Sequence, residues 1–144
     1  MNRNKLFLLF ILSILLFSCQ NGYKQHYETF EEFNKVNQRN KGWFPKIIFK
    51  DATELKNISY LDSLCAFGKF QYTNTEIYDS IFLIDSKIDY KYFRDKVIRN
   101  IKLKPNWFID IGNLDKTNIE LIKKDGFLIL KNNETKSIYF ILSN

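Results

Sequence analysis

The clearest pattern of apolar positions lies in the last quarter of the chain. Apolar runs at 119–122, 127–130 and 138–142 are separated by short polar segments. Asp125-Gly126, between the first two runs, tolerates the positive φ angles of a type I′ hairpin turn. An Asn-Asn-Glu-Thr segment after the second run provides another turn. We therefore predict a three-stranded antiparallel meander. Because both of its faces are apolar, we expect one of them to pack under helices.

Three segments, near 29–40, 75–85 and 89–101, repeat apolar residues at the three- and four-residue spacing of an amphipathic helix. The first two open with a Thr-x-x-Glu capping box, at Thr29 and Thr73, in which side chains satisfy free backbone amides. The side chains expected to face the core are Phe30, Phe33, Val36, Ile77, Ile81, Ile84, Tyr90, Phe93, Val97 and Ile101.

Four further short strands are predicted, at 46–49, 55–60, 65–73 and 107–111. Within the third, Gly68 indicates a close backbone approach or a bulge. These elements predict an α+β fold: a single small domain with an antiparallel sheet, the C-terminal three-stranded meander and about three helices.

The N-terminus has the pattern of an export signal. A short basic head with Arg3 and Lys5 precedes the apolar run 6–17, which is too short to stay as a membrane-spanning helix of about 20 residues. The segment Leu16-Phe17-Ser18-Cys19 then resembles the lipobox of bacterial lipoproteins, although Phe17 is bulkier than the small residue usual there. An uncleaved N-terminal anchor is the alternative.

The lipobox resemblance implies a diacylglyceryl thioether and an N-acyl group on Cys19, and two or three acyl chains give stable membrane anchoring. Gln20, in place of Asp, implies the outer membrane, with the domain on the periplasmic face. The predicted organisation is a signal peptide at 1–18, a lipidated tether at 19–28 and a single globular α+β domain at 29–144.

Composition supports a packed domain with a mild positive charge. Hydrophobic residues make up 45% of the chain and aromatic residues 17%, which argues against disorder. Loss of Arg3 and Lys5 with the signal lowers the formal net charge from +6 to +4. That excess favours a negatively charged surface nearby, but it is too small to indicate nucleic-acid binding. Export to the envelope also argues against a nucleic-acid partner.

The third predicted helix carries most of the positive charge on one side. Lys87, Lys91, Arg94, Arg99 and Lys102 fall opposite its apolar stripe. On a domain held near a membrane, such a face could contact anionic lipid headgroups. The alternative is an ordinary solvated face of an amphipathic helix.

Residues with catalytic potential are sparse. Once Cys19 carries lipid, Cys65 has no disulfide partner, and its apolar neighbours predict a buried, inert thiol. His26, the one histidine, falls in the predicted tether, so no nucleophile has a neighbouring base in the sequence. Trp43 and Trp107 fit core packing, with a ligand cleft as the alternative. The scattered carboxylates form no metal loop, so we expect no metal and no cofactor.

Several segments of the mature chain resemble a group of small bacterial lipoproteins of unknown activity. The residues that carry the resemblance are Trp43-Phe44-Pro45, Ala52 to Leu55, Leu61-Asp62, Gly68-Lys69-Phe70, Trp107-Phe108, Asp125-Gly126 and Tyr139-Phe140. The resemblance spans most of the mature chain and implies fold and localisation. It implies no activity.

The sequence therefore favours a lipid-anchored envelope protein that binds a partner and catalyses no reaction. The partner would be another envelope protein or a toxin that the domain neutralises. The alternative is a small-molecule-binding or enzymatic domain with a cleft between sheet and helices.

Overall fold

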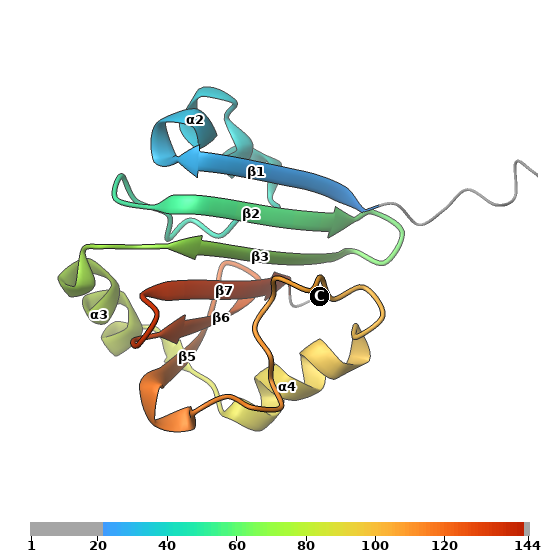
Figure 1. Cartoon of the computed structure of the whole chain (residues 1–144), viewed down its shortest axis with the longest axis vertical. Coiled ribbons are helices and arrows are strands. Elements are labelled where there is room, and N and C mark those ends of the chain that lie inside the picture. Colours follow the sequence, from blue (N-terminus) through green and yellow to red (C-terminus); the bar gives the residue numbers. More distant parts are fainter. Residues whose placement is uncertain (1–21, 143–144) are drawn as a thin grey trace, which may run out of the picture.

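The computed structural model describes residues 22–142, which form one antiparallel sheet with helices on both faces (Figure 1). The strands are β1 (Tyr23–Thr29), β2 (Thr53–Tyr60), β3 (Cys65–Gln71), β4 (Ser86–Lys87), β5 (Ile119–Lys124), β6 (Phe127–Asn132) and β7 (Ser137–Leu142). The helices are α2 (Phe30–Lys35), α3 (Thr75–Ile84) and α4 (Tyr90–Arg99), with 3-10 turns η1 (Gln38–Lys41) and η2 (Lys116–Asn118). In this part of the chain the strand order is β1-β2-β3-β7-β6-β5-β4.

The predicted C-terminal meander is confirmed. Asp125 and Gly126 take φ angles of 51° and 81°, and Lys124 pairs with Phe127 across the turn. In the second turn the Asn132 side chain accepts backbone hydrogen bonds from the two residues at its tip. Strand β7 then pairs with β3 on its other side, so the last strand joins the meander to the N-terminal strands.

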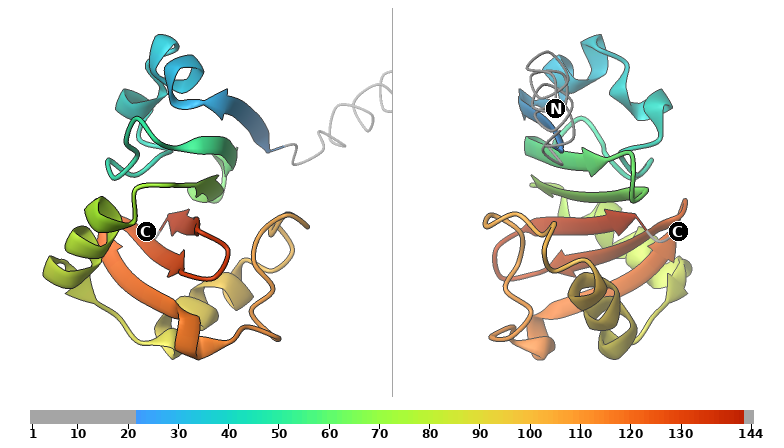
Figure 2. Two further views of the ribbon diagram at one scale, coloured as in Figure 1. Left: turned by 60° about the vertical axis from the view of Figure 1, so that its left-hand side comes forward. Right: turned by 90° about the vertical axis from the view of Figure 1, so that its right-hand side faces the viewer.

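Apolar layers cover both faces of the sheet, where one covered face was expected. The face that we call the α2–α3 face carries Phe33, Phe44, Phe70, Tyr78, Phe82, Ile129 and Phe140. The opposite face, the α4 face, carries Ile58, Phe67, Phe93, Val97, Phe108, Leu128 and Ile141. Figure 2 shows helices on either side of the sheet. The fold is therefore a sheet-dominated α+β structure with two separate cores.

The close backbone approach predicted at Gly68 is confirmed. A Cβ atom there would lie 1.9 Å from Cζ of Phe140, the cross-strand partner of Gly68 on β7. The Phe140 ring therefore fills the space that a side chain at position 68 would need, and it lies within ring-packing distance of Phe44, Phe70 and Phe127.

Two of the predicted strands, at 46–49 and 107–111, are wrong. Both segments are irregular and cover opposite faces of the sheet, with Ile48 and Phe108 almost fully buried. Side chains satisfy part of their backbone in place of a neighbouring strand: Arg39 donates to the Ile48 carbonyl, and the Tyr90 hydroxyl donates to the carbonyl at the end of the second segment. Their apolar sequences reflect burial without strand pairing.

The first two helices differ from prediction in extent and orientation. The segment 29–40 is interrupted at Asn37, which takes a φ of 51°, and Val36 is exposed. Thr29 does cap α2 as expected. Helix α3 is capped by Asn74, one position after the predicted cap Thr73, and it buries Tyr78 and Phe82.

The expected isoleucine stripe of α3 is therefore wrong for Ile77 and Ile84, whereas Ile81 is partly buried against the core as predicted. Ile84 is 83% exposed and Ile77 is 37% exposed. The larger aromatic side chains, one position along the helix, take the inward face because they bury more apolar area.

Helix α4 follows the prediction for most of its length. Phe93 and Val97 are fully buried, and the Asp89 side chain caps the first turn. Ile101, expected on the same apolar stripe, lies beyond the end of the helix and is 52% exposed.

The predicted tether at 19–28 is wrong for residues 23–28, because they belong to β1 and pair in register with β2. Their largely polar composition concealed a strand whose two faces have different surroundings. The predicted signal at 1–18 and Cys19 lie outside the described residues. Within 22–142 no helix has the length and hydropathy needed to cross a membrane.

Candidate functional site: a basic groove on an edge ribbon

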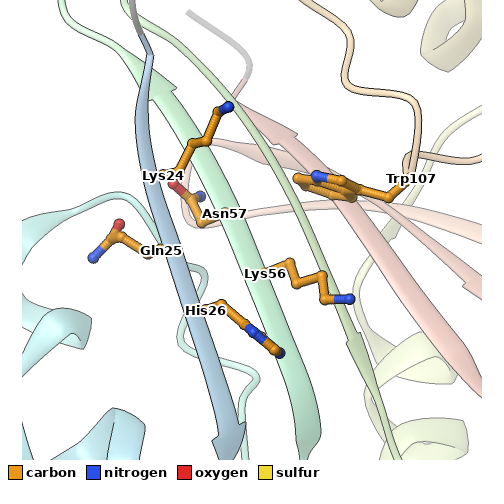
Figure 3. Close-up of a pocket in the computed structure, with 6 residues that line it drawn as sticks. All are labelled: Lys24, Gln25, His26, Lys56, Asn57 and Trp107. Carbon is orange, nitrogen blue, oxygen red and sulfur yellow. The ribbon is translucent and has the colours of Figure 1, made fainter.

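Strands β1 and β2 carry a row of basic side chains on the α4 face. Lys24 pairs with Ile58, and His26 pairs with Lys56, so these side chains project from the same side of the ribbon. Figure 3 shows Lys24, His26 and Lys56 on that side, with the Trp107 indole across from them and Gln25 extending in the opposite direction.

The loop that follows α4 forms the other wall. We call the whole surface the basic groove, and its principal residues are Lys24, His26, Lys56, Tyr60, Lys102, Lys104 and Trp107. It comprises two adjoining open hollows that share Lys24 and Trp107. One, of about 290 Å³, lies beside His26 and Lys56, and the other, of about 530 Å³, lies beside Gly22 and Lys102. The sizes suit a small ligand or a short stretch of another chain.

The side chains that line the groove carry positive charge. The residues lining its two hollows include four lysines and a histidine, with no aspartate or glutamate among them. Lys56 also pairs across the strands with Lys69, whose ammonium lies 5.4 Å from the centre of the Tyr139 ring. Like charges directly opposite each other in a sheet are unfavourable. An anionic group in the groove would relieve this repulsion.

One carboxylate, Glu54, lies at the rim of the groove. Its Oε2 is 3.5 Å from Nε2 of His26 and 3.6 Å from Nζ of Lys56. All three side chains are substantially exposed, so these ion pairs are weak. Glu54 leaves most of the positive charge of the groove unbalanced.

The backbone at Glu54 is unusual. Glu54 takes a φ of 51°, and the pairing of β2 with β3 shifts register between Thr53 and Lys56, which marks a β-bulge. A positive φ is uncommon for a residue other than glycine, and bulges occur preferentially near sites of function. The irregularity lies directly beside His26 and Lys56, so it supports the groove as the candidate site.

Trp107 is positioned by its buried neighbour and by β2. Phe108 inserts into the core on the α4 face, where its ring centre lies 4.9 Å from that of Phe67. The Tyr60 hydroxyl donates a 3.0 Å hydrogen bond to the Leu103 carbonyl and holds the loop against the ribbon. Trp107 thus packs partly on the core while lining the groove, and Trp43 packs against the opposite core. Both tryptophans therefore pack on a core, and Trp107 also lines an open hollow.

The structure does not gather the five predicted basic residues on one helix face. Lys87 lies in β4, with its Nζ 3.1 Å from Glu120. Lys91 and Arg94 on α4 approach Asp95 at 2.6 Å and 3.5 Å. The hydrogen bond from Lys91 lowers the pKa of Asp95 below its ordinary value. Asp95 therefore offsets part of the charge of this helix.

The remaining two predicted basic residues lie at the end of α4. Arg99 donates from Nε to the backbone carbonyl of Asp95. Lys102 lies just beyond the helix and lines the basic groove. Of the five, the structure brings only Lys102 to the candidate site.

Sequence reasoning missed Lys24, His26 and Lys56. The sequence pattern places the first two in a tether and the third in a weakly patterned strand. The available signal was the alternation of basic residues with Gln25 and Tyr27 in β1, which marks a strand with one buried face. That alternation extends over too few residues to be distinguished from a polar linker.

Two other titratable side chains, those of Cys65 and Lys131, are buried in the interior of the domain. Cys65 is 2% exposed, as predicted, and burial raises the pKa of its thiol to about 11. Lys131 is fully buried, with its Nζ 2.5 Å from Asp79 and 2.5 Å from Glu120. Within residues 22–142, no group of three or more His, Cys, Asp or Glu side chains could hold a metal ion.

Fold and site together define a sheet-dominated α+β domain with a basic groove on its edge ribbon. A family model described as the YbbD head domain matches residues 22–71, about a third of the chain. The chain is similar to that family over β1, α2, β2 and β3. Searches of the curated proteins and of the solved structures returned no match. The matched segment contains Lys24, His26, Glu54 and Lys56, whereas Trp107 lies outside it.

Proposed function

We propose that this protein is anchored by lipid on Cys19 at the periplasmic face of the outer membrane and binds an acidic segment of a partner protein. The binding surface is the basic groove. The partner is a neighbouring envelope protein or a toxin that the domain neutralises. The observation that carries the proposal is a groove lined by four lysines, a histidine and a tryptophan, without a carboxylate among its lining residues.

The shape of the groove favours a segment of chain over a compact small molecule. Its two hollows share Lys24 and Trp107 and open to solvent along the α4 face of the ribbon. Strand β1 is also the terminal strand of the sheet, and an edge strand offers unpaired backbone groups to an extended partner. An extended acidic segment lying along β1 would meet lysines at its side chains and hydrogen-bonding groups at its backbone.

The chemistry of the groove favours binding over catalysis. His26 is the one histidine there, and the lining residues include no Ser, Thr or Cys for it to activate. The Tyr60 hydroxyl is engaged by the Leu103 carbonyl. The side chains offer charge, hydrogen-bond donors and an aromatic surface, which are the elements of a recognition site.

The proposal is tested by titrating the full-length protein with an oligoglutamate peptide while following tryptophan fluorescence. Reversal of two groove charges, Lys24→Glu with Lys56→Glu, should weaken binding by about tenfold or more. Each reversal replaces an attraction of about 1 kcal/mol with a repulsion of similar size. Trp107→Phe should remove the fluorescence response and identify Trp107 as its source.

A matched control carries the same change of net charge away from the groove. Lys91→Glu with Arg94→Glu alters two exposed cations on α4. This pair should change the affinity for the peptide by less than about threefold, because distant surface charges are screened within about 8 Å at physiological salt. Equal loss of affinity in both double variants would reduce the effect to net charge and contradict a specific groove. Unchanged affinity in the groove variant would contradict the proposal outright.

A further inference from the structure

One end of the domain presents large apolar side chains to solvent. Leu61 and Leu64, in the turn between β2 and β3, are 73% and 55% exposed. Tyr23 at the start of β1 is 60% exposed, and Ile101 beyond α4 is 52% exposed. We call these four residues the apolar tip. Exposed apolar groups at one end of a domain mark a surface that meets another apolar phase.

The turn that carries the two leucines is conformationally costly. Leu64 takes a φ of 46°, and its amide donates to the Leu61 carbonyl to close the turn. Glycine or asparagine adopts that backbone conformation at lower cost. Leu64 gains no core burial in return, because its side chain projects into solvent. Because the backbone of Leu64 is strained and its side chain is not buried, the structure indicates that this leucine contacts something outside the domain.

The chain enters the domain at this same end. Gly22 lies against Ile58 and Tyr60 at the end of β2, just before the turn. In Figure 1 the start of β1 lies beside the turn between β2 and β3. Tyr60 also contacts the loop after α4 through Leu103, which brings Ile101 and Lys102 to this end.

The distance from the proposed lipid to the tip is short. With residues 23–28 in the sheet, two residues, Gln20 and Asn21, separate Cys19 from Gly22, and the three Cα–Cα steps between Cys19 and Gly22 span at most about 11 Å. A ten-residue tether would have allowed about 35 Å and no fixed orientation. The short link keeps the start of β1 close to the headgroup region. Arg99, two residues before Ile101, matches the negative charge of such a surface.

We propose that the apolar tip inserts into the lipid headgroup region and holds the domain upright, with the turn between β2 and β3 toward the bilayer. This inference rests on the proposed lipidation of Cys19. It assigns the membrane contact to the end of the domain, and the side of α4 with Lys91 and Arg94 then faces away from lipid. The basic groove runs from the tip along β1, so a partner reaches it from the periplasmic side.

The test uses the full-length lipidated protein in vesicles of phosphatidylethanolamine and phosphatidylglycerol. Leu61→Cys and Leu64→Cys variants carry a bimane label, and brominated lipids report its depth. Glu134→Cys, in the turn between β6 and β7 at the opposite end of the strands, is the matched control. The unsubstituted protein, with its buried Cys65, gives the background labelling. Labels at 61 and 64 should be quenched about twice as strongly as a label at 134, because an interfacial element enters by about 5–10 Å.

A second set of variants separates insertion from mere proximity. Leu61→Asn with Leu64→Gly removes the apolar groups, and glycine suits the positive φ at position 64, so folding is retained. Quenching of a bimane at Ile101→Cys should fall in this background. Equal quenching at both ends would overturn the inference. If mass spectrometry shows that the N-terminus of the same protein is acylated, the proposed anchor remains intact.

Two further outcomes would overturn the proposed lipid contact. An unacylated N-terminus would overturn the proposed anchor, and the inference would fall with it. A blue shift of the bimane label that depends on protein concentration and needs no vesicles would assign the tip to a second copy of the chain and overturn the lipid contact.

Discussion

The two sides of the β1–β2 ribbon belong to the same strands but have opposite surroundings. On the α2–α3 face, Gln25, Leu55 and Asn57 are buried under α2 and the segment that follows it. On the α4 face, Lys24 and His26 are exposed, because the cover provided by α4 and its following loop ends near Ile58. One side of the ribbon is part of a core, while the other side borders an open groove.

This difference separates the residues that maintain the fold from those available for recognition. On the covered side even polar groups are engaged in packing, since Asn57 donates a 2.9 Å hydrogen bond to the Trp43 carbonyl. On the open side the cations stabilise nothing in the core, and Lys56 opposes Lys69 at a local electrostatic cost. The fold alone does not require the repulsion between Lys56 and Lys69. A binding site for an acidic partner would account for it.

The largest effect should come from the covered face. Phe140→Ala removes a fully buried ring that packs over Gly68, and it should lower the free energy of unfolding by about 3–5 kcal/mol. Lys56→Ala, on the open side, should change it by no more than about 0.5 kcal/mol. Urea unfolding followed by circular dichroism measures both. Comparable losses in the two variants would break the distinction between the two sides.

A smaller effect should appear in the pH dependence of stability on the covered face. Burial tends to raise the pKa of Glu120, but hydrogen bonds from Lys131, Lys87 and Asn133 outweigh it and hold the pKa below its ordinary value. The stability that Glu120 contributes is therefore present above its unfolded pKa, near 4.3, and is lost as the pH falls through the lower folded value.

Replacement of Lys131 should weaken this dependence. Lys131→Met removes one donor to Glu120, so the loss of stability on acidification from neutral pH to about pH 3 should shrink by up to about 1 kcal/mol. The remaining bonds to Lys87 and Asn133 keep part of it. Urea unfolding at a series of pH values provides the measurement. An unchanged or steeper dependence would show that Lys131 does not hold the charge of Glu120.

The smallest effect concerns Glu54, the carboxylate that pairs with His26 and Lys56 at the rim of the groove. Glu54→Gln removes its competition for His26 and Lys56 and should strengthen oligoglutamate binding by about two- to fivefold, the size of an exposed ion pair. Glu54→Gly should strengthen binding to a similar degree while fitting the φ of 51°. Isothermal titration compares the two variants with the unsubstituted protein. Weaker binding in both would assign Glu54 to the recognition surface itself.

The sequence predicted those elements whose signal is local. The meander, β3 and most of α4 carry their periodicity and turn residues within a few positions, and the structure confirms them. The more weakly patterned β2 is confirmed as well. The apolar runs at 46–49 and 107–111 wrongly predict strands, because an apolar run indicates burial without showing whether its backbone pairs with a neighbouring strand. The inward face of α3 was misplaced by one position for a related reason, since only the assembled core selects between Ile77 and Tyr78.

The groove could not be predicted because its residues come together only in the folded chain. Lys24 and His26 looked like part of a linker, and their strand identity depends on pairing with β2. Trp107 reaches them from a loop about eighty positions away, which is held in place by Phe108 and Tyr60. By contrast, the basic residues of α4 stand out in the sequence, but Asp95 offsets part of their charge.

The most direct test of the groove is an NMR titration of ¹⁵N-labelled protein with oligoglutamate. It follows the chemical shifts of the backbone amides and of the indole N–H groups. The largest shifts should occur at Lys24, His26 and Lys56 and at the indole N–H of Trp107, with little change at Lys91 and Arg94. These shifts should become smaller as salt is raised. Shifts centred on α4, or spread evenly over the lysines of the domain, would contradict the basic groove as the binding site.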